Sequence, residues 1–249
     1  MNLPAMTNQP LLGKSALVTG GARRIGRGIA LALAQAGAEV TITFRSSQAE
    51  AAETVSEIER LGCHALAVEC DVRSELSVRS AVAAAVDRFG RLDIVVNSAA
   101  IFETASLDTL SLDQWDAVFE TNARGPFLVA REALPHLRAA KGRIVNIGSL
   151  GGIHAWASHA HYCASKAAVH SLTQAMAKAF APEVSVNCVA PGWIQIDEDP
   201  SPLAAHFAAK TPMQCNGSVQ DVAQAVLFFA AGPHFITGQV LAVDGGLGL

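Results

Sequence analysis

The chain has 249 residues, of which 51% are hydrophobic and 16% are charged, and its formal net charge is −4. This composition can bury a large core, which excludes a disordered chain, and the slightly acidic balance argues against nucleic-acid binding. No run is apolar for long enough to span a bilayer, and residues 1–10 lack the pattern of a signal peptide. The five cysteines form no CxxC pair, which fits neither a disulfide framework nor a zinc knuckle, so we expect a cytoplasmic protein.

Short runs rich in Val and Ile alternate with helix-period segments along the whole chain. The runs predict strands buried on both faces at residues 15–19, 40–44, 65–69, 94–97, 143–147, 184–189 and 239–243. Helices are expected at residues 26–36, 47–61, 76–89, 111–120, 125–139, 162–180 and 219–230. Gly37 and Gly62 stand where two of these helices would end, because glycine readily takes positive φ. The alternation predicts a single-domain α/β Rossmann fold over residues 1–249, with a doubly wound parallel sheet of about seven strands and helices on both faces.

The segment 193–214 is the one irregular insertion in this pattern. It contains Pro200, Pro202 and Pro212, together with an acidic cluster at residues 197–199. Because ligands bind beyond the carboxyl ends of such strands, we expect a flap over the substrate here. A plain surface loop with a short helix is the alternative.

A glycine-rich turn, TGGARRIG at residues 19–26, lies between the first predicted strand and the first helix. Glycine lets the backbone approach a pyrophosphate, and the helix N-terminus offers free N–H groups to it. The turn therefore predicts a dinucleotide site that includes Gly20, Arg23, Arg24, Ile25 and Gly26.

The end of the second predicted strand discriminates between the nicotinamide cofactors. NAD-binding proteins of this kind place a carboxylate there, whereas this chain has Arg45, Ser46 and Ser47. An arginine binds phosphate through parallel hydrogen bonds, so we expect these residues and one of Arg23 and Arg24 to hold the 2′-phosphate of NADP(H). Alternatively, Arg45 is a solvated surface residue and Ser46 caps a helix.

Tyr162 and Lys166 are four residues apart in a predicted helix and so share one face. A nearby ammonium favours the phenolate and would lower the tyrosine pKa, which would make Tyr162 a usable acid near neutral pH. Ser149 and Asn97 are expected at the ends of the fifth and fourth strands, and Asn122 at the start of the helical segment that leads to Pro126. These groups would meet at the carboxyl edge of the sheet.

Together the motifs resemble the short-chain dehydrogenase/reductase family over residues 12–249. The resemblance rests on the TGGARRIG turn, Asp71, NSAA at 97–100, Asn122, Ser149, YCASK at 162–166, PG at 191–192 and VDGG at 243–246. It implies an NADP(H)-dependent oxidoreductase that acts on a small molecule, and it implies a homotetramer.

The resemblance also implies a role for each matching residue. Tyr162 would give a proton to a carbonyl oxygen as hydride arrives from the nicotinamide, and Ser149 would hydrogen-bond that oxygen. Lys166 would hold the nicotinamide ribose, and Asn122 would support a water relay behind it. Further cofactor contacts are implied for Asp71 and Val72 at the adenine, Asn97 and Ala99 at the adenosine ribose, and Pro191, Gly192 and Ile194 on the nicotinamide side.

Several departures from the family pattern bear on the substrate. Arg24 replaces the middle glycine of the turn, as in the pteridine and dihydromonapterin reductases. Phe102 matches the aromatic that stacks on a pterin there, or it is a generic wall of the pocket, since an apolar residue at this place is common in the wider family. Ile196 replaces a threonine near the cofactor amide. Trp156 and Trp193 would line a flat pocket, or simply fill the core.

Three functions follow from these observations. The leading hypothesis is reduction of a ketone or oxoacyl carbonyl, and reduction of a dihydropterin is the alternative. A regulatory protein that binds the cofactor without chemistry is a third reading, which the intact Ser149, Tyr162 and Lys166 disfavour. His154, His159 and His161 precede the tyrosine, but nothing supplies a fourth ligand, so no metal is expected.

Overall fold

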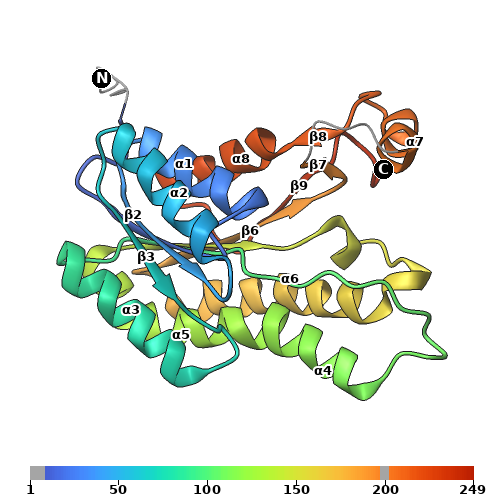
Figure 1. The fold of residues 1–249 in the computed structure, drawn as a ribbon, viewed down its shortest axis with the longest axis horizontal. Coiled ribbons are helices and arrows are strands. Elements are labelled where there is room, and N and C mark those ends of the chain that lie inside the picture. Colours follow the sequence, from blue (N-terminus) through green and yellow to red (C-terminus); the bar gives the residue numbers. More distant parts are fainter. Residues whose placement is uncertain (1–8, 197–201) are drawn as a thin grey trace.

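The computed structural model describes residues 9–196 and 202–249. Seven strands form its main sheet: β1 (Ser15–Thr19), β2 (Glu39–Phe44), β3 (Ala65–Glu69), β4 (Ile94–Asn97), β5 (Arg143–Ile147), β6 (Ser185–Pro191) and β9 (Val240–Val243). All are parallel, in the order β3-β2-β1-β4-β5-β6-β9 (Figure 1). The seven predicted strands are confirmed, with shifts of one or two residues at the ends of β2, β6 and β9.

Helices cover both faces of the sheet, as predicted (Figure 1). The upper layer in Figure 1 consists of α1 (Arg24–Gln35), α2 (Gln48–Arg60) and α8 (Val219–Ala231). The lower layer consists of α3 (Glu75–Phe89), α4 (Leu112–Phe119), α5 (Gly125–Ala140) and α6 (Ala160–Phe180). Gly37 and Gly62, just beyond α1 and α2, have φ of +96° and +88°, which explains why those helices end there.

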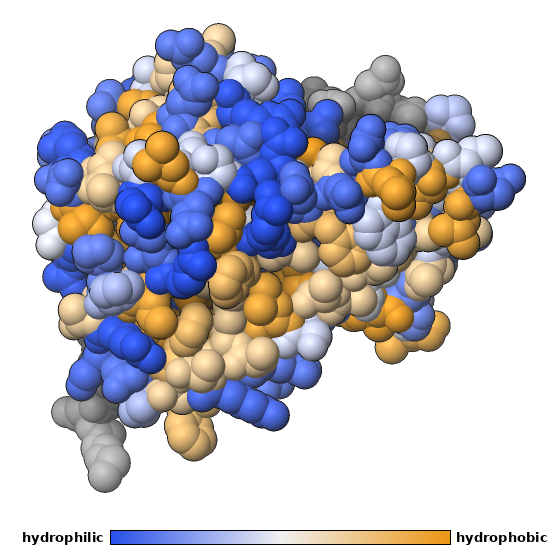
Figure 2. All heavy atoms as spheres, turned by 90° about the horizontal axis from the view of Figure 1, so that it is seen from below, coloured by the Kyte–Doolittle hydropathy of each residue, from blue (hydrophilic) through white to orange (hydrophobic). Residues whose placement is uncertain are grey.

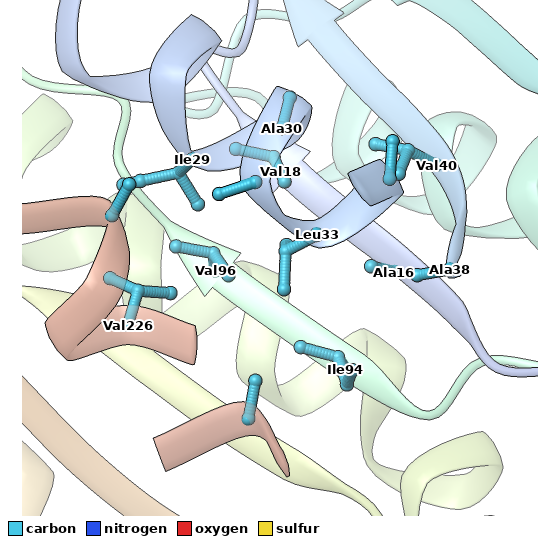
Figure 3. Packing of buried hydrophobic residues seen from close by; sticks show 14 of the residues in the cluster. Ala16, Val18, Ile29, Ala30, Leu33, Ala38, Val40, Ile94, Val96 and Val226 are labelled. Carbon is cyan, nitrogen blue, oxygen red and sulfur yellow. The ribbon is translucent and has the colours of Figure 1, made fainter. Parts of the chain in front are cut away.

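The core on the upper face packs α1 and α8 against the central strands. In register, Val18 of β1 lies between Ile42 of β2 and Val96 of β4. Ile29 and Leu33 of α1 cover these side chains, and all five are fully buried (Figure 3). Burial of each such side chain contributes about 1.5–3 kcal/mol, so the runs of Val and Ile and the apolar stripe of α1 together fix the position of the turn between them.

A π-helical turn at Glu120–Arg124 links α4 to α5 without a break in the helical path. Asn122, expected at the start of the helical segment that leads to Pro126, therefore lies within a continuous helical path. Asn122 is 1% exposed and lies inside the π turn, which rotates its side chain toward the interior. No glycine or proline marks the turn itself, since Gly125 and Pro126 follow it.

The segment predicted as a flap contains one helix, which the alternative reading allowed for, and one short strand that was not predicted. Helix α7 (Pro202–Lys210) is the short helix allowed for in the alternative reading, and β7 (Ile194–Gln195) pairs in parallel with β8 (Gly217–Ser218). The segment is thus held at both ends by the small sheet, and the Met213 N–H donates to the carbonyl of Gly245 near the C-terminus. The acidic cluster and Pro200 lie outside the described residues.

The strand order reverses between β1 and β4, because the chain runs outward to β3 and then returns to the far side of β1. In sheets of this kind, the crevice for a ligand opens at the carboxyl ends of the two strands at this switch point. No helix in the described part of the chain is both long and apolar enough to cross a membrane.

Candidate active site

A cavity of about 330 Å³ opens at the switch point, over the turn that follows β1. Most of the residues predicted to bind the cofactor line it: Gly20, Arg23, Arg24, Ile25, Gly26, Arg45, Ser46, Ser47, Asp71, Val72 and Ala99. Phe102, predicted as a substrate contact, lines the cavity as well. The wall also contains Ala22, Ser98 and Ala100, which lie within the quoted motifs, and Thr43, Phe44, Cys70, Ile101 and Thr121, which no motif predicted.

The turn closes tightly because two of its glycines lie against backbone. A Cβ on Gly26 would come 2.2 Å from the carbonyl oxygen of Gly20, and Gly20 itself has φ of +65°. Arg24, where the family pattern has glycine, also adopts a left-handed backbone with φ of +53°. That conformation costs a non-glycine residue about 1–2 kcal/mol relative to glycine. The backbone at this position would therefore favour glycine, yet the chain has an arginine there.

Three arginines give the cavity a positive wall. Among the described residues, no carboxylate forms an ion pair with Arg23, Arg24 or Arg45. The carboxylate of Asp71, on the same wall, is instead held by Arg73 through three side-chain contacts of 2.6–3.1 Å. The bond from the Arg73 side chain, with smaller contributions from its charge and that of Arg45, lowers the pKa of Asp71. The three wall arginines therefore remain available to an anion.

The loop after β4 forms the opposite wall of the cavity. The Thr19 hydroxyl accepts the N–H groups of Ser98 and Ala99 at 3.0 and 3.1 Å, which ties this loop to the end of β1. The Asn97 side chain turns away and donates to Asn146 at 2.8 Å inside the sheet. The predicted ribose contact by Asn97 therefore does not involve its side chain in this structure, whereas Ala99 faces the cavity.

Ser149 and Tyr162 meet beside this cavity. The strand β5 ends at Ile147, two residues before Ser149, and Ser149 caps a 3₁₀ turn (Leu150–Gly152) with its hydroxyl accepting the Gly151 N–H at 3.0 Å. Tyr162 lies in the first turn of α6, where its side chain is hydrogen-bonded to that of Ser149. Helix and strand thus bring the two hydroxyls together across 13 residues of sequence, as the motif predicts.

Aromatic rings surround the tyrosine, which is the only one in the chain. The ring of Phe102 meets that of Tyr162 edge-on at 4.8 Å and stacks on His159 at 4.5 Å. Trp156 lies nearly parallel to Tyr162 with centroids 6.5 Å apart. Because Phe102 also lines the cavity, it connects the tyrosine to the predicted cofactor site.

The environment of Tyr162 contradicts one expectation from the sequence. Burial raises the pKa of Tyr162 above its usual value, and the hydrogen bond from Ser149 only partly opposes this effect. The Lys166 ammonium, 5.8 Å from the tyrosine ring centroid, donates to the Ile147 carbonyl at 2.7 Å and not to the tyrosine hydroxyl, and the effect of burial on the pKa of Tyr162 dominates. Burial also lowers the pKa of Lys166 to about 8. The tyrosine is therefore fully protonated at neutral pH, as a proton donor must be.

Asn122 locks the loop after β4 to α6. Its side-chain oxygen accepts the Ile101 N–H at 2.9 Å, and its nitrogen donates to the Ile101 carbonyl and to the Ser165 hydroxyl at 3.0 and 3.1 Å. Ser165 is adjacent to Lys166 in α6. The π turn is what allows this reach, so the unusual helix geometry has a direct consequence at the site.

The residues predicted on the nicotinamide side lie at the end of β6. Pro191 is buried there, Gly192 donates to the Val243 carbonyl at 2.9 Å, and Ile194 packs against the core in β7. Trp193 stacks on Phe207 of α7 at 4.3 Å, so any substrate contact by Trp193 would be made next to α7. Ile196, where the family pattern has threonine, lines the cavity.

The histidines before the tyrosine are separated in the structure. His154 bonds the Gly248 carbonyl, His159 stacks on Phe102, and His161 is fully buried. Within residues 9–196 and 202–249, no group of three His, Cys, Asp or Glu side chains could hold a metal ion.

Comparison with known proteins places this geometry in context. Residues 20–248 match the family described as enoyl-(acyl carrier protein) reductase. The 3-oxoacyl-(acyl-carrier-protein) reductase FabG of Staphylococcus aureus is 36% identical over 240 residues, which cover 94% of this chain and 98% of that protein. A dehydrogenase/reductase from Sinorhizobium meliloti superposes with a TM-score of 0.93 at 37% identity, covering 99% of this chain and 100% of that one. A short-chain dehydrogenase from Burkholderia cenocepacia, crystallised with NADP, has a TM-score of 0.91 at 39% identity, with 96% and 100% covered.

Proposed function

Because the chain belongs to the short-chain dehydrogenase/reductase family, we propose that this oxidoreductase uses NADPH to reduce the carbonyl group of a ketone or oxoacyl substrate. The observation that carries the proposal is the pairing of Ser149 with a protonated Tyr162 beside a cavity whose wall holds three arginines that form no ion pair with any described residue. An acid, a hydrogen-bond donor for the substrate oxygen and a phosphate site are thus gathered at one edge of the sheet.

The cavity fits a dinucleotide phosphate in two respects. Gly20 and Gly26 leave room for a pyrophosphate to approach the backbone at the N-terminus of α1, where a Cβ on Gly26 would clash with the chain itself. Arg45, Ser46, Ser47 and one of Arg23 and Arg24 would hold the 2′-phosphate. Asp71, Val72, the backbone of Asn97 and Ala99 would hold the adenosine, and Pro191, Gly192 and Ile194 the nicotinamide end. The bound cofactor supplies a hydride, which the protein itself cannot provide.

The side chains of the protein would orient the substrate carbonyl group and supply the proton. Ser149 donates a hydrogen bond to the carbonyl oxygen, and Tyr162 transfers its phenolic proton to that oxygen as the carbonyl carbon accepts hydride, so the product is an alcohol. The pKa raised by burial keeps the donor protonated before each turnover. Lys166 would hold the nicotinamide ribose, and Asn122 would support the water relay that returns a proton to Tyr162.

Reduction of a dihydropterin is the second candidate, and one observation favours it. Arg24 and Phe102, the two residues that resemble the pteridine reductases, both line the cavity, and Phe102 is 59% exposed. One face of the Phe102 ring is stacked on His159, so a pterin ring would stack on the opposite face of Phe102.

Two substrates offered side by side test the proposal. NADPH oxidation by the purified protein would be followed with an acetoacetyl thioester and with a dihydropterin. We expect turnover of the thioester. Turnover of the pterin alone would favour the second candidate, dihydropterin reduction. Absence of turnover with both substrates and with a panel of small ketones would contradict carbonyl reduction.

We further propose that the protein resides in a reducing, cytoplasmic setting, since its five cysteines are free and four of them are buried. We also propose that it forms a homotetramer. On the face seen from below, hydrophobic residues gather in a band between hydrophilic ones (Figure 2). Exposed apolar side chains on the helices of that layer include Leu112 and Trp115 of α4 and Phe127 of α5. Such surface is typical of association. Analytical ultracentrifugation that showed a monomer at micromolar concentration would contradict it.

A further inference from the structure

His170 lies one helical turn after Lys166 on α6, behind the turn that carries Ser149. Its half-buried ring fills the space against two glycines of that turn. A Cβ on Gly148 would lie 2.3 Å from Nε2 of His170, and a Cβ on Gly152 would lie 2.6 Å from Cε1. The imidazole is thus in close contact with the backbone on both sides of Ser149.

The ring also accepts a hydrogen bond from this turn. The backbone N–H of Ser149 points to Nε2 of His170 with a separation of 3.4 Å. Every other polar group of Ser149 has a partner as well: its hydroxyl accepts from Gly151, and its carbonyl accepts from Gly152 at 2.9 Å. Since an amide can only donate, Nε2 must be unprotonated, and the proton of the neutral ring is on Nδ1.

The charges around the ring favour this neutral form. Burial lowers the pKa of His170, and the positive charge of Lys166 lowers it further. On β6, the Cys188 thiol lies on the same side of Gly148 as the ring, 2.7 Å from the same added Cβ position, but burial raises its pKa to about 11, so it carries no charge at neutral pH. Among the described residues, Lys166 is the one charged group that acts on the ring.

We propose that neutral His170 is a positioning residue, which holds the Ser149 hydroxyl in line with Tyr162 by accepting the Ser149 backbone N–H. The inference rests on the proposed function in that it gives Ser149 a role in the reaction. Protonation of the ring replaces the acceptor with an N–H donor that faces the Ser149 N–H and adds a second cation near Lys166. The turn then loses its support, and reduction slows as the pH falls through the pKa of His170, below the usual value of 6.5.

Hydrogen exchange of the Ser149 amide tests the positioning without any substrate or cofactor. In His170→Leu we expect this amide to exchange roughly tenfold faster at pH 7, because one hydrogen bond has lost its acceptor. His170→Gln retains an amide oxygen at a similar reach and should stay within about threefold of the wild-type rate. Equal Ser149 protection in His170→Leu and the wild type, in folded protein, would overturn the inference.

The inference also predicts two kinetic effects: loss of the His170 acceptor lowers kcat, and the fall of the wild-type kcat at acidic pH depends on His170. We expect His170→Leu to lower kcat about tenfold while its Kd for NADPH stays within about twofold. His170→Gln should lose the acidic limb of the kcat profile. His159→Gln is the matched control, because burial also lowers the pKa of His159, which stacks on the Phe102 ring that contacts Tyr162. Persistence of the limb in His170→Gln, or its disappearance in His159→Gln, would contradict the inference.

The exchange and kinetic experiments together distinguish failure of the inference from failure of the proposed function. If the wild type reduces no carbonyl substrate, the proposed function fails, and the exchange of the Ser149 amide still decides whether His170 supports the turn. If reduction is seen but exchange is unchanged in His170→Leu, the function stands and the positioning role falls.

Discussion

Replacement of Arg45 by alanine tests how the cavity selects its cofactor. Arg45 lies just beyond β2, where an NAD-specific site would carry a carboxylate. The nearest acidic group on that wall, Asp71, is occupied by Arg73 at 2.6–3.1 Å and does not neutralise Arg45 through an ion pair. The substitution therefore removes a positive charge that no described carboxylate pairs with, and it leaves the rest of the wall in place.

The size of the effect follows from the kind of contact that is lost. A hydrogen bond to a charged group contributes about 1.5–3 kcal/mol, and the lower end applies because Arg45 is exposed to solvent. About 1.5 kcal/mol corresponds to a loss of roughly tenfold in NADPH affinity. NADH lacks the 2′-phosphate, so its affinity should change little, and the preference for NADPH should fall by the same factor.

Cofactor titrations followed by fluorescence measure both affinities directly. Arg60→Ala is the matched control, since Arg60 is an exposed arginine in the last turn of α2 and does not line the cavity. Higher salt should weaken NADPH binding more in the wild type than in Arg45→Ala. An NADPH-to-NADH affinity ratio that is the same in Arg45→Ala and the wild type would refute the assignment of the phosphate site.

Two further predictions concern ionisation. Asp93, 3% exposed, accepts bonds from Arg91, Lys14 and the Ser15 N–H, which lower its pKa despite its burial. Asp93→Asn should therefore cost about 2 kcal/mol of unfolding free energy at pH 7, and the difference from the wild type in urea titrations should shrink progressively as the pH falls below about 4, toward the lowered pKa of Asp93. A constant difference down to pH 3, or an equal loss in the exposed control Asp87→Asn, would contradict this. Because Tyr162 is the only tyrosine, ultraviolet absorbance reads its ionisation, and tyrosinate should appear only above about pH 10; a midpoint below 9 would contradict the dominance of burial.

Local pattern was sufficient for the sheet and for the grouping of the main site residues. Strands such as β1 and β4 are continuous apolar runs, so burial on both faces is visible in the sequence. The turn after β1 needs glycine at Gly26 for a steric reason that any tight strand-to-helix turn imposes. The spacing of Tyr162 and Lys166 fixes their common face once the helix is known.

Contacts distant in sequence determined what could not be predicted. The pairing of β7 with β8 joins segments more than 20 residues apart, and two-residue strands have no periodicity to detect. The π turn at Asn122 depends on partners in Ile101 and Ser165, which only the folded chain brings near. The direction of the Tyr162 pKa shift was wrong because burial, and not the spacing to Lys166, dominates it. His170 was missed because a histidine four residues after the lysine belongs to no motif.

The central claim is that Tyr162 donates the proton to a carbonyl oxygen, and Tyr162→Phe tests it most directly. The variant removes one oxygen and keeps the aromatic contacts with Phe102 and Trp156. Single-turnover oxidation of NADPH with the carbonyl substrate, measured alongside the Kd for NADPH, would separate chemistry from binding. The account predicts an unchanged Kd and a rate at least about a hundredfold lower, the usual contribution of a general acid. A rate within about threefold of the wild type would contradict it.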